Sequence, residues 1–204
     1  MPKTGSTFIQ LMLREEIIEV RRHSFDRYIN GSARTQHIYS IYRPPVAWYT
    51  SFASFLVSGS ERYVGGTFII TKSMDQCGVP ITVDTVALVL LNQMPNVKNQ
   101  LHLHIPVHEP TAYNFIRLWQ MYDGDIYSFW CNHYLANTTV LSQQHLSSDF
   151  GKVALSHGLN ELANKLLTAE PINVTTNKQR LSHDVEDTIR DMCKGAETLY
   201  APRF

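Results

Sequence analysis

The sequence lacks several features that mark common classes of protein. Its 18 Lys and Arg residues balance its 18 Asp and Glu residues, so it has no net charge at pH 7. A protein that coats nucleic acid through a broad basic face needs clustered cations, so we expect no nucleic-acid partner. No apolar run reaches the roughly 18 residues that a membrane span requires, and the polar start MPKTGSTFIQ is not a signal peptide. These absences favour a cytoplasmic location but leave the compartment open.

The sequence also has little that indicates a metal site or a disulfide framework. Cys77, Cys131 and Cys193 are odd in number and form no C-x-x-C pair, so we expect three unreactive thiols. An H-x-H-x3-H run begins at His102, but no carboxylate or cysteine flanks it at a spacing typical of metal ligands. We therefore expect no metal.

One α/β domain covering residues 1–204 is expected. The length and the 44% hydrophobic content suffice for a sizeable core, and no repeat or Pro/Gly/Ser linker divides the chain. A strand over 37–42, two prolines and a helix over 46–56 together predict an α/β unit. Other predicted elements are helices over 83–92, 112–122, 147–157, 159–168 and 182–200, a strand over 138–141, and loops at 65–66, 101–110 and 171–180.

The first candidate site is the hexapeptide Pro2–Thr7, which precedes apolar residues at helical spacing. A helix N-terminus offers an anion its unpaired backbone N–H groups and the positive end of the helix dipole. Lys3 adds a cation, Gly5 allows close approach of the backbone, and Ser6 adds a hydroxyl donor. The Walker A pattern is absent, which disfavours ordinary ATP or GTP hydrolysis. A plain helix cap would account for the same residues.

The second candidate site follows the first predicted strand. Arg43 ends that strand, and Ser51 lies eight positions later, about two turns into the next predicted helix. A guanidinium and a hydroxyl with this spacing suit one phosphate group.

These two elements resemble the nucleotide-binding motifs of sulfotransferases that use 3′-phosphoadenosine 5′-phosphosulfate (PAPS). PKTGST is similar to the family's P-K-[ST]-G-[ST]-[ST] loop for the 5′-phosphosulfate. Arg43, Pro45 and Ser51 match its R-x-P-x5-S element for the 3′-phosphate in type and spacing. The run RPPVAWYTSFASF most resembles bacterial-type and carbohydrate sulfotransferases. The likeness is good over residues 1–57 and loose over 138–204.

The resemblance implies a P-loop NTPase-like sulfotransferase fold, with three αβα layers and a mostly parallel central sheet. It implies transfer of a sulfuryl group from PAPS to a hydroxyl of a carbohydrate or small molecule, with residues 60–137 on the acceptor side and helices over 138–204. Catalysis of such transfers is mostly positioning and electrostatic stabilisation, so no metal is expected. Lys3 is assigned to the bridging oxygen as it gains charge. The implied nucleotide-binding residues are Lys3, Thr4, Gly5, Ser6, Thr7, Arg43, Ser51 and Lys178.

His23 is the candidate general base for the acceptor hydroxyl. Its imidazole is suited to accepting a proton near neutral pH, and the segment 23–28 resembles the stretch with the catalytic histidine in uronyl 2-O-sulfotransferases. Other branches of the family use a glutamate, so Glu15, Glu16 and Glu19 remain alternatives. An ordinary surface role for His23 also remains open.

Two further groups have two interpretations each. Lys178 and Arg180 suit either closure over the nucleotide phosphates or plain surface charge. The histidine run from His102, together with nearby aromatic residues, suits either stacking on a sugar acceptor or simple packing. Those aromatic residues are Tyr113, Trp119 and Tyr122.

The family's fold places a buried parallel strand before the phosphate loop. Because Met1 stands directly before Pro2, we expect the sheet of this chain to lack that first strand. Two other functions remain open: a nucleotide kinase-like phosphotransferase, which needs a carboxylate pair for Mg²⁺, and a catalytically inactive module that binds a nucleotide or a glycan. The sequence does not predict the acceptor's identity or the oligomeric state.

Overall fold

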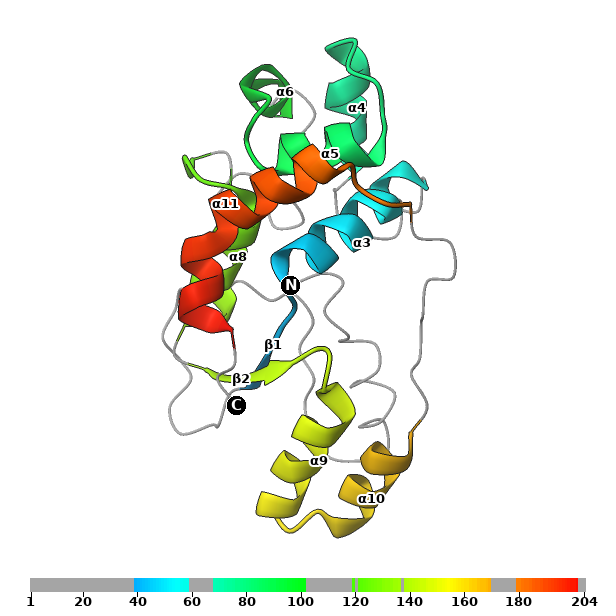
Figure 1. Cartoon of the computed structure of the whole chain (residues 1–204), viewed down its shortest axis with the longest axis vertical. Helices are drawn as coiled ribbons and strands as arrows, with labels where there is room; N and C mark the ends of the chain where they lie inside the picture. Colours follow the sequence, from blue (N-terminus) through cyan, green and yellow to red (C-terminus); the bar gives the residue numbers. More distant parts are fainter. Residues whose placement is uncertain are drawn as a thin grey trace, which may run out of the picture. The chain divides into compact units, whose positions relative to one another are not determined.

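The computed structural model describes residues 39–58, 68–101, 119, 121–136, 138–169 and 179–201. Over these ranges the protein is α/β and mostly helical, with eight helices and a two-stranded parallel sheet (Figure 1). The α/β class with parallel strands, predicted from the sequence, is confirmed in this coarse form. Within the same ranges, no helix combines the length and the apolar composition needed to cross a membrane.

The elements form two compact units. In chain order the elements are β1 (Tyr39–Tyr42), α3 (Pro45–Val57), α4 (Phe68–Gln76), α5 (Val83–Leu90), α6 (Pro95–Gln100), α8 (Ile126–Tyr134), β2 (Thr139–Ser142), α9 (Leu146–Ser156), α10 (Asn160–Thr168) and α11 (His183–Tyr200). The sheet unit contains β1, β2, α9 and α10. The helical unit contains α3 to α6 and most of α8 and α11. A single domain over 1–204 stays a prediction.

In the sheet unit, β1 and β2 pair in parallel, with Tyr39 opposite Thr139 and Tyr42 opposite Ser142. Both strands contain β-branched residues, and β1 adds two tyrosines, which favour extended backbone. The Gln143 N–H donates to the Tyr42 carbonyl oxygen at 2.8 Å and so adds a bond just beyond β2. The strands predicted over 37–42 and 138–141 are confirmed over 39–42 and 139–142.

A short turn joins α9 to α10 and explains why α9 ends where it does. Gly158 has a φ of 73°, a left-handed conformation that glycine adopts without a steric penalty. Its N–H donates to the Leu155 carbonyl, and the Leu159 N–H donates to the Ala154 carbonyl. This pair of bonds is the Schellman pattern that closes a helix C-terminus.

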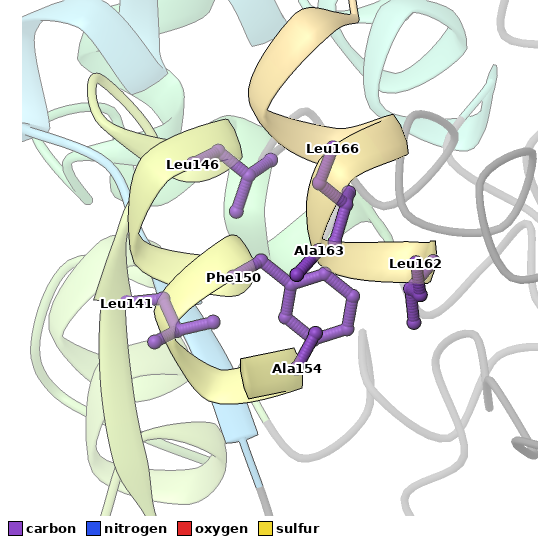
Figure 2. Close-up of a cluster of buried hydrophobic side chains, with 7 residues drawn as sticks. All are labelled: Leu141, Leu146, Phe150, Ala154, Leu162, Ala163 and Leu166. Atoms are coloured by element: carbon purple, nitrogen blue, oxygen red, sulfur yellow. The ribbon is translucent and has the colours of Figure 1, made fainter. Parts of the chain in front are cut away.

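Among the described residues, the buried core of the sheet unit is aliphatic apart from Phe150. Figure 2 shows the Phe150 ring among side chains of β2, α9 and α10. The apolar positions of α9 recur every fourth residue, so they share one helix face. The buried cluster consists of Leu141, Leu146, Phe150, Ala154, Leu162, Ala163 and Leu166.

The core of the helical unit is built from large aromatic side chains. The Trp48 ring of α3 meets the Tyr49 ring edge to face at a centroid distance of 4.9 Å and the Tyr127 ring of α8 at 5.6 Å. Trp48, Tyr49, Phe52 and Tyr127 have no exposed surface. Such ring pairs stabilise a core beyond the area that they bury, by about 0.5–1.5 kcal/mol each.

Polar contacts fix both ends of α5. The Thr82 hydroxyl accepts from the Thr85 N–H, and the Thr85 hydroxyl accepts from the Thr82 N–H, which is a capping box. The helix ends at Leu90, and Asn92 turns the chain with a φ of 62°, which asparagine tolerates. The helix predicted over 83–92 is therefore confirmed but two residues too long.

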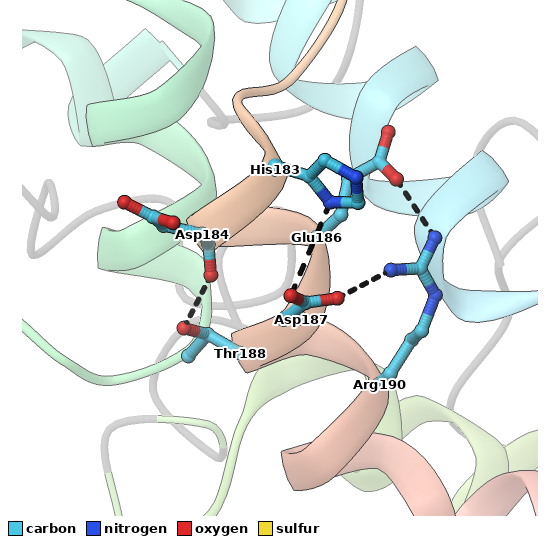
Figure 3. Close-up of polar contacts among 6 residues, drawn as sticks. All are labelled: His183, Asp184, Glu186, Asp187, Thr188 and Arg190. Atoms are coloured by element: carbon cyan, nitrogen blue, oxygen red, sulfur yellow. Dashed lines mark hydrogen bonds and ion pairs between the residues drawn. The ribbon is translucent and has the colours of Figure 1, made fainter.

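Helix α11 is tied to α5 and carries ion pairs along its exposed surface. The Ser182 N–H, just before α11, donates to Asp84 Oδ1 at 2.9 Å. Figure 3 shows the Arg190 guanidinium between Glu186 at 2.8 Å and Asp187 at 2.7 Å. These carboxylates raise the pKa of Arg190, with the Glu186 hydrogen bond as the largest cause. Exposed pairs of this kind contribute little to stability.

The sequence predicted four other helices well and missed three. Predictions over 46–56, 147–157, 159–168 and 182–200 agree with α3, α9, α10 and α11 within about one residue at each end. Helices α4, α6 and α8 were not predicted. Of the helix predicted over 112–122, the structure describes Trp119, which is helical, and Met121 and Tyr122, which are not. The loops predicted over 65–66, 101–110 and 171–180 lie outside the described residues except at three positions: Leu101 caps the end of α6, and Gln179 and Arg180 are in neither a helix nor a strand.

Candidate functional site

The carboxyl end of β1 carries Arg43, the first predicted ligand residue in the described part of the chain. Arg43 directly follows Tyr42 and is only 8% exposed. Burial lowers the pKa of its guanidinium, but arginine remains charged at physiological pH. A charge attracts an anion more strongly where the local dielectric is low. A guanidinium at this position offers the positive charge and the planar N–H donors that suit a phosphate.

Two parallel strands end at the same edge of the sheet unit. The register sets Tyr42 opposite Ser142, so Arg43 and Gln143 both leave the sheet at its carboxyl edge. The start of α9 is tied to this edge, because Asp149 Oδ2 accepts from the Ser142 N–H at 3.1 Å. In open α/β proteins, ligands bind outside the carboxyl ends of parallel strands.

Ser51, the second predicted phosphate ligand, lies on the buried side of α3 and is 7% exposed. The helix begins at Pro45, whose fixed φ suits a first helical position. The predicted order of strand, tight turn and helix is therefore confirmed. Arg43 belongs to the sheet unit and Ser51 to the helical unit.

The other predicted site residues lie outside the described residues, and their roles remain predictions. They are Lys3, Thr4, Gly5, Ser6, Thr7, His23 and Lys178, together with the alternative bases Glu15, Glu16 and Glu19, the histidines at 102, 104 and 108, and Tyr113. Within the ranges that the structure does describe, no three or more His, Cys, Asp or Glu side chains are grouped to hold a metal ion.

Trp119, which we considered for the acceptor side, packs inside the helical unit. It has no exposed surface, and the Lys98 ammonium lies 5.4 Å from its ring centroid. Lys98 also donates to the Tyr122 carbonyl, and burial lowers the pKa of this lysine. Because its ring is covered, Trp119 supports the packing interpretation rather than stacking on a sugar.

A buried polar cluster in the helical unit was missed by the sequence analysis. Asp125 is 3% exposed, and its Oδ1 accepts from the Tyr49 hydroxyl at 2.9 Å and the Ser128 N–H at 2.8 Å. The Cys193 thiol of α11 donates to the same oxygen at 3.6 Å. Asp125 is thus the N-cap of α8, and an aspartate directly before an apolar run is the signal that could have predicted it.

The cysteines are free thiols, as expected. Burial raises the pKa of Cys131 to about 12 and also raises the pKa of Cys193. Because the thiolate is the nucleophilic form of cysteine, these two side chains are unreactive near neutral pH. Chemistry at a candidate site therefore has to come from other residues.

Comparisons of this chain with models of known protein families, with curated proteins and with solved structures find no match. A functional hypothesis for the protein therefore depends on its own motifs and on the strand, turn and helix that carry Arg43 and Ser51.

Proposed function

We propose that this protein is a sulfotransferase that moves a sulfuryl group from PAPS to a hydroxyl of a carbohydrate or small-molecule acceptor. The proposal includes the finer fold, a three-layer P-loop-like sulfotransferase domain with a mostly parallel central sheet. The observation that carries it is the position of Arg43: a buried guanidinium directly after a parallel strand, two residues before the helix that holds Ser51.

This position suits a nucleotide phosphate for physical reasons. A guanidinium presents several N–H donors in a fixed plane and can bind two phosphate oxygens at once. A phosphomonoester such as the 3′-phosphate of PAPS carries close to two negative charges at pH 7. The motif spacing of Arg43, Pro45 and Ser51 supplies a cation, a helix start and a hydroxyl in that order.

The remaining roles follow from the chemistry that sulfuryl transfer requires. PAPS supplies the sulfuryl group and leaves as the 3′,5′-bisphosphate. Residues Thr4 to Thr7 bind the 5′-phosphosulfate, and Lys3 neutralises the charge that grows on the bridging oxygen. His23 accepts the proton of the acceptor hydroxyl, and Lys178 contributes to nucleotide binding.

Calorimetry with 3′-phosphoadenosine 5′-phosphate, the desulfated form of PAPS, tests the proposal. We expect the full chain to bind it, and we expect an Arg43→Lys/Ser51→Ala variant to bind at least tenfold more weakly, because lysine loses the two-pronged contact. Arg190→Ala is the matched control, since this arginine is exposed and already bonded to Glu186 and Asp187. Circular dichroism checks that every variant is folded.

Two results would contradict the proposal. One is a folded chain that fails to bind this nucleotide at millimolar concentration. The other is wild-type affinity in the Arg43→Lys/Ser51→Ala variant. For the chemical step, His23→Ala should retain nucleotide binding and lose most turnover of PAPS.

A further inference from the structure

We infer that the turn between β2 and α9, residues Gln143 to His145, forms a second part of the binding site for the nucleotide's 3′-phosphate. The inference rests on the proposed function and assigns two further residues to it. Gln144 and His145 would donate side-chain N–H groups to the phosphate that Arg43 binds.

Strand register is the first observation that supports this assignment. Tyr42 pairs with Ser142, so the next residues, Arg43 and Gln143, leave a parallel pair at one edge. The Gln143 N–H donates to the Tyr42 carbonyl at 2.8 Å, so the two chain segments are still bonded to each other at that point. All of these residues belong to the sheet unit.

The hydrogen bonds of the turn fix its main chain. The Gln144 N–H is bonded to the Ser142 hydroxyl at 3.3 Å, and the His145 carbonyl accepts from the Asp149 N–H at 2.8 Å. The Gln144 and His145 side chains are exposed, whereas Ser142 before them and Leu146 after them are buried. A fixed backbone that carries two exposed N–H-bearing side chains is a suitable platform for a ligand.

The charges at this edge indicate why a phosphate needs more than Arg43. One guanidinium neutralises about half of a doubly charged phosphate. Asp149, 6% exposed, adds a carboxylate to the same edge, where it is bonded to the Ser142 N–H. Amide and imidazole N–H donors hydrogen-bond to a phosphate without adding negative charge to this edge.

The discriminating experiment compares two nucleotides that differ only in the 3′-phosphate: 3′-phosphoadenosine 5′-phosphate and adenosine 5′-phosphate. We expect Gln144→Ala/His145→Ala to weaken binding of the first by about tenfold and to leave binding of the second unchanged. His145→Gln, which keeps an N–H donor, should recover part of the loss. His157→Ala is the matched control, because this histidine lies at the other end of α9, where its ring contacts Tyr39.

Each outcome decides the inference. A loss confined to the 3′-phosphorylated nucleotide supports it, whereas an equal loss for both nucleotides shows that the turn has a general structural role and overturns it. Unchanged affinity for both nucleotides also overturns it, while the proposed function stands. If the wild-type chain binds neither nucleotide, the proposed function and this inference both fail.

Discussion

The sheet unit and the helical unit bury different kinds of side chain in their cores. The sheet unit packs leucines and alanines around the Phe150 ring, with Tyr39 against the edge of this cluster. The helical unit packs several aromatic rings around Trp48 and buries Asp125, whose Oδ1 accepts from Tyr49, Ser128 and Cys193, whereas the buried Asp149 of the sheet unit accepts from the Ser142 N–H. The stability of an aliphatic core depends mainly on whether a substitution changes the side-chain volume. The stability of a buried polar cluster falls when any one of its hydrogen-bonding partners is removed. The helical unit should therefore be the one more sensitive to single polar substitutions.

The sequence offers a separate probe for each unit. The chain has three tryptophans, Trp48, Trp119 and Trp130, and all of them belong to the helical unit. Tryptophan fluorescence therefore reports on that unit alone. Hydrogen exchange of backbone amides in α9 and α10 reports on the sheet unit.

The largest expected effect comes from Asp125→Ala in the helical unit. The substitution removes the N-cap of α8 and leaves the buried Tyr49 hydroxyl and the partly buried Ser128 N–H without their acceptor. We expect a loss of about 3–5 kcal/mol in the free energy of unfolding, measured by urea denaturation with tryptophan fluorescence. Asp125→Asn keeps an acceptor oxygen and should lose far less. Similar losses for both variants would contradict a role for the acceptor.

What the sequence predicted and what it missed follows the contrast between units only in part, because α3, α5 and α11 of the helical unit were predicted as well. Both strands, α9 and α10 were predicted because their signals are local. These signals are β-branched residues in the strands, a glycine at position 158 that ends α9, and apolar residues at every fourth position of a helix. Helices α4 and α8 begin with aromatic and β-branched residues, FII and IYSF, which locally favour a strand. Tertiary packing overrides that preference in the helical unit, so local patterns could not reveal it.

Local sequence patterns also reveal only part of the candidate site. Arg43 and Ser51 could be selected from the sequence because their spacing is a motif on one continuous strand, turn and helix. The turn at Gln144 and His145 could not, because only the parallel register between β1 and β2 brings it to the edge that Arg43 occupies. A pairing between strands about a hundred residues apart leaves no local pattern in a single sequence.

An intermediate effect is expected from Gly151→Val in the sheet unit. A Cβ at Gly151 would lie 3.1 Å from two carbon atoms of Leu167, and a branched side chain adds more volume in the same place. We expect a loss of about 1–3 kcal/mol, seen as faster exchange of amides in α9 and α10. Tryptophan fluorescence should change little if the units unfold separately.

The matched control for this substitution is Gly195→Ala in α11. A Cβ at Gly195 meets nothing within 4 Å, and alanine is the better helix former by about 1 kcal/mol. This variant should stabilise the helical unit. A loss of stability in Gly195→Ala would contradict the open space around that position. A large fluorescence shift from Gly151→Val would contradict separate unfolding of the two units.

The smallest expected effect concerns how the free energy of unfolding depends on pH, which Tyr49→Phe should change. Burial, and next the charge of Asp125, raise the pKa of Tyr49 well above its ordinary value of 10.0. Above pH 10 the unfolded chain therefore loses the phenol proton while the folded chain keeps it. Stability is fully present below pH 10 and falls by about 1.4 kcal/mol per pH unit above it, until the folded pKa is reached.

Tyr49→Phe removes both the fall in stability above pH 10 and the hydrogen bond to Asp125. We expect the variant to be less stable than the wild type by about 1 kcal/mol at pH 8, and the gap to close near pH 11 as the wild type loses stability. Urea denaturation followed by tryptophan fluorescence between pH 8 and 11 measures both. Tyr39→Phe, which removes a phenol from the sheet unit, should leave the fluorescence-detected slope unchanged. A constant gap between wild type and Tyr49→Phe across this range would show that the Tyr49 phenol ionises as readily in the folded helical unit as in the unfolded chain.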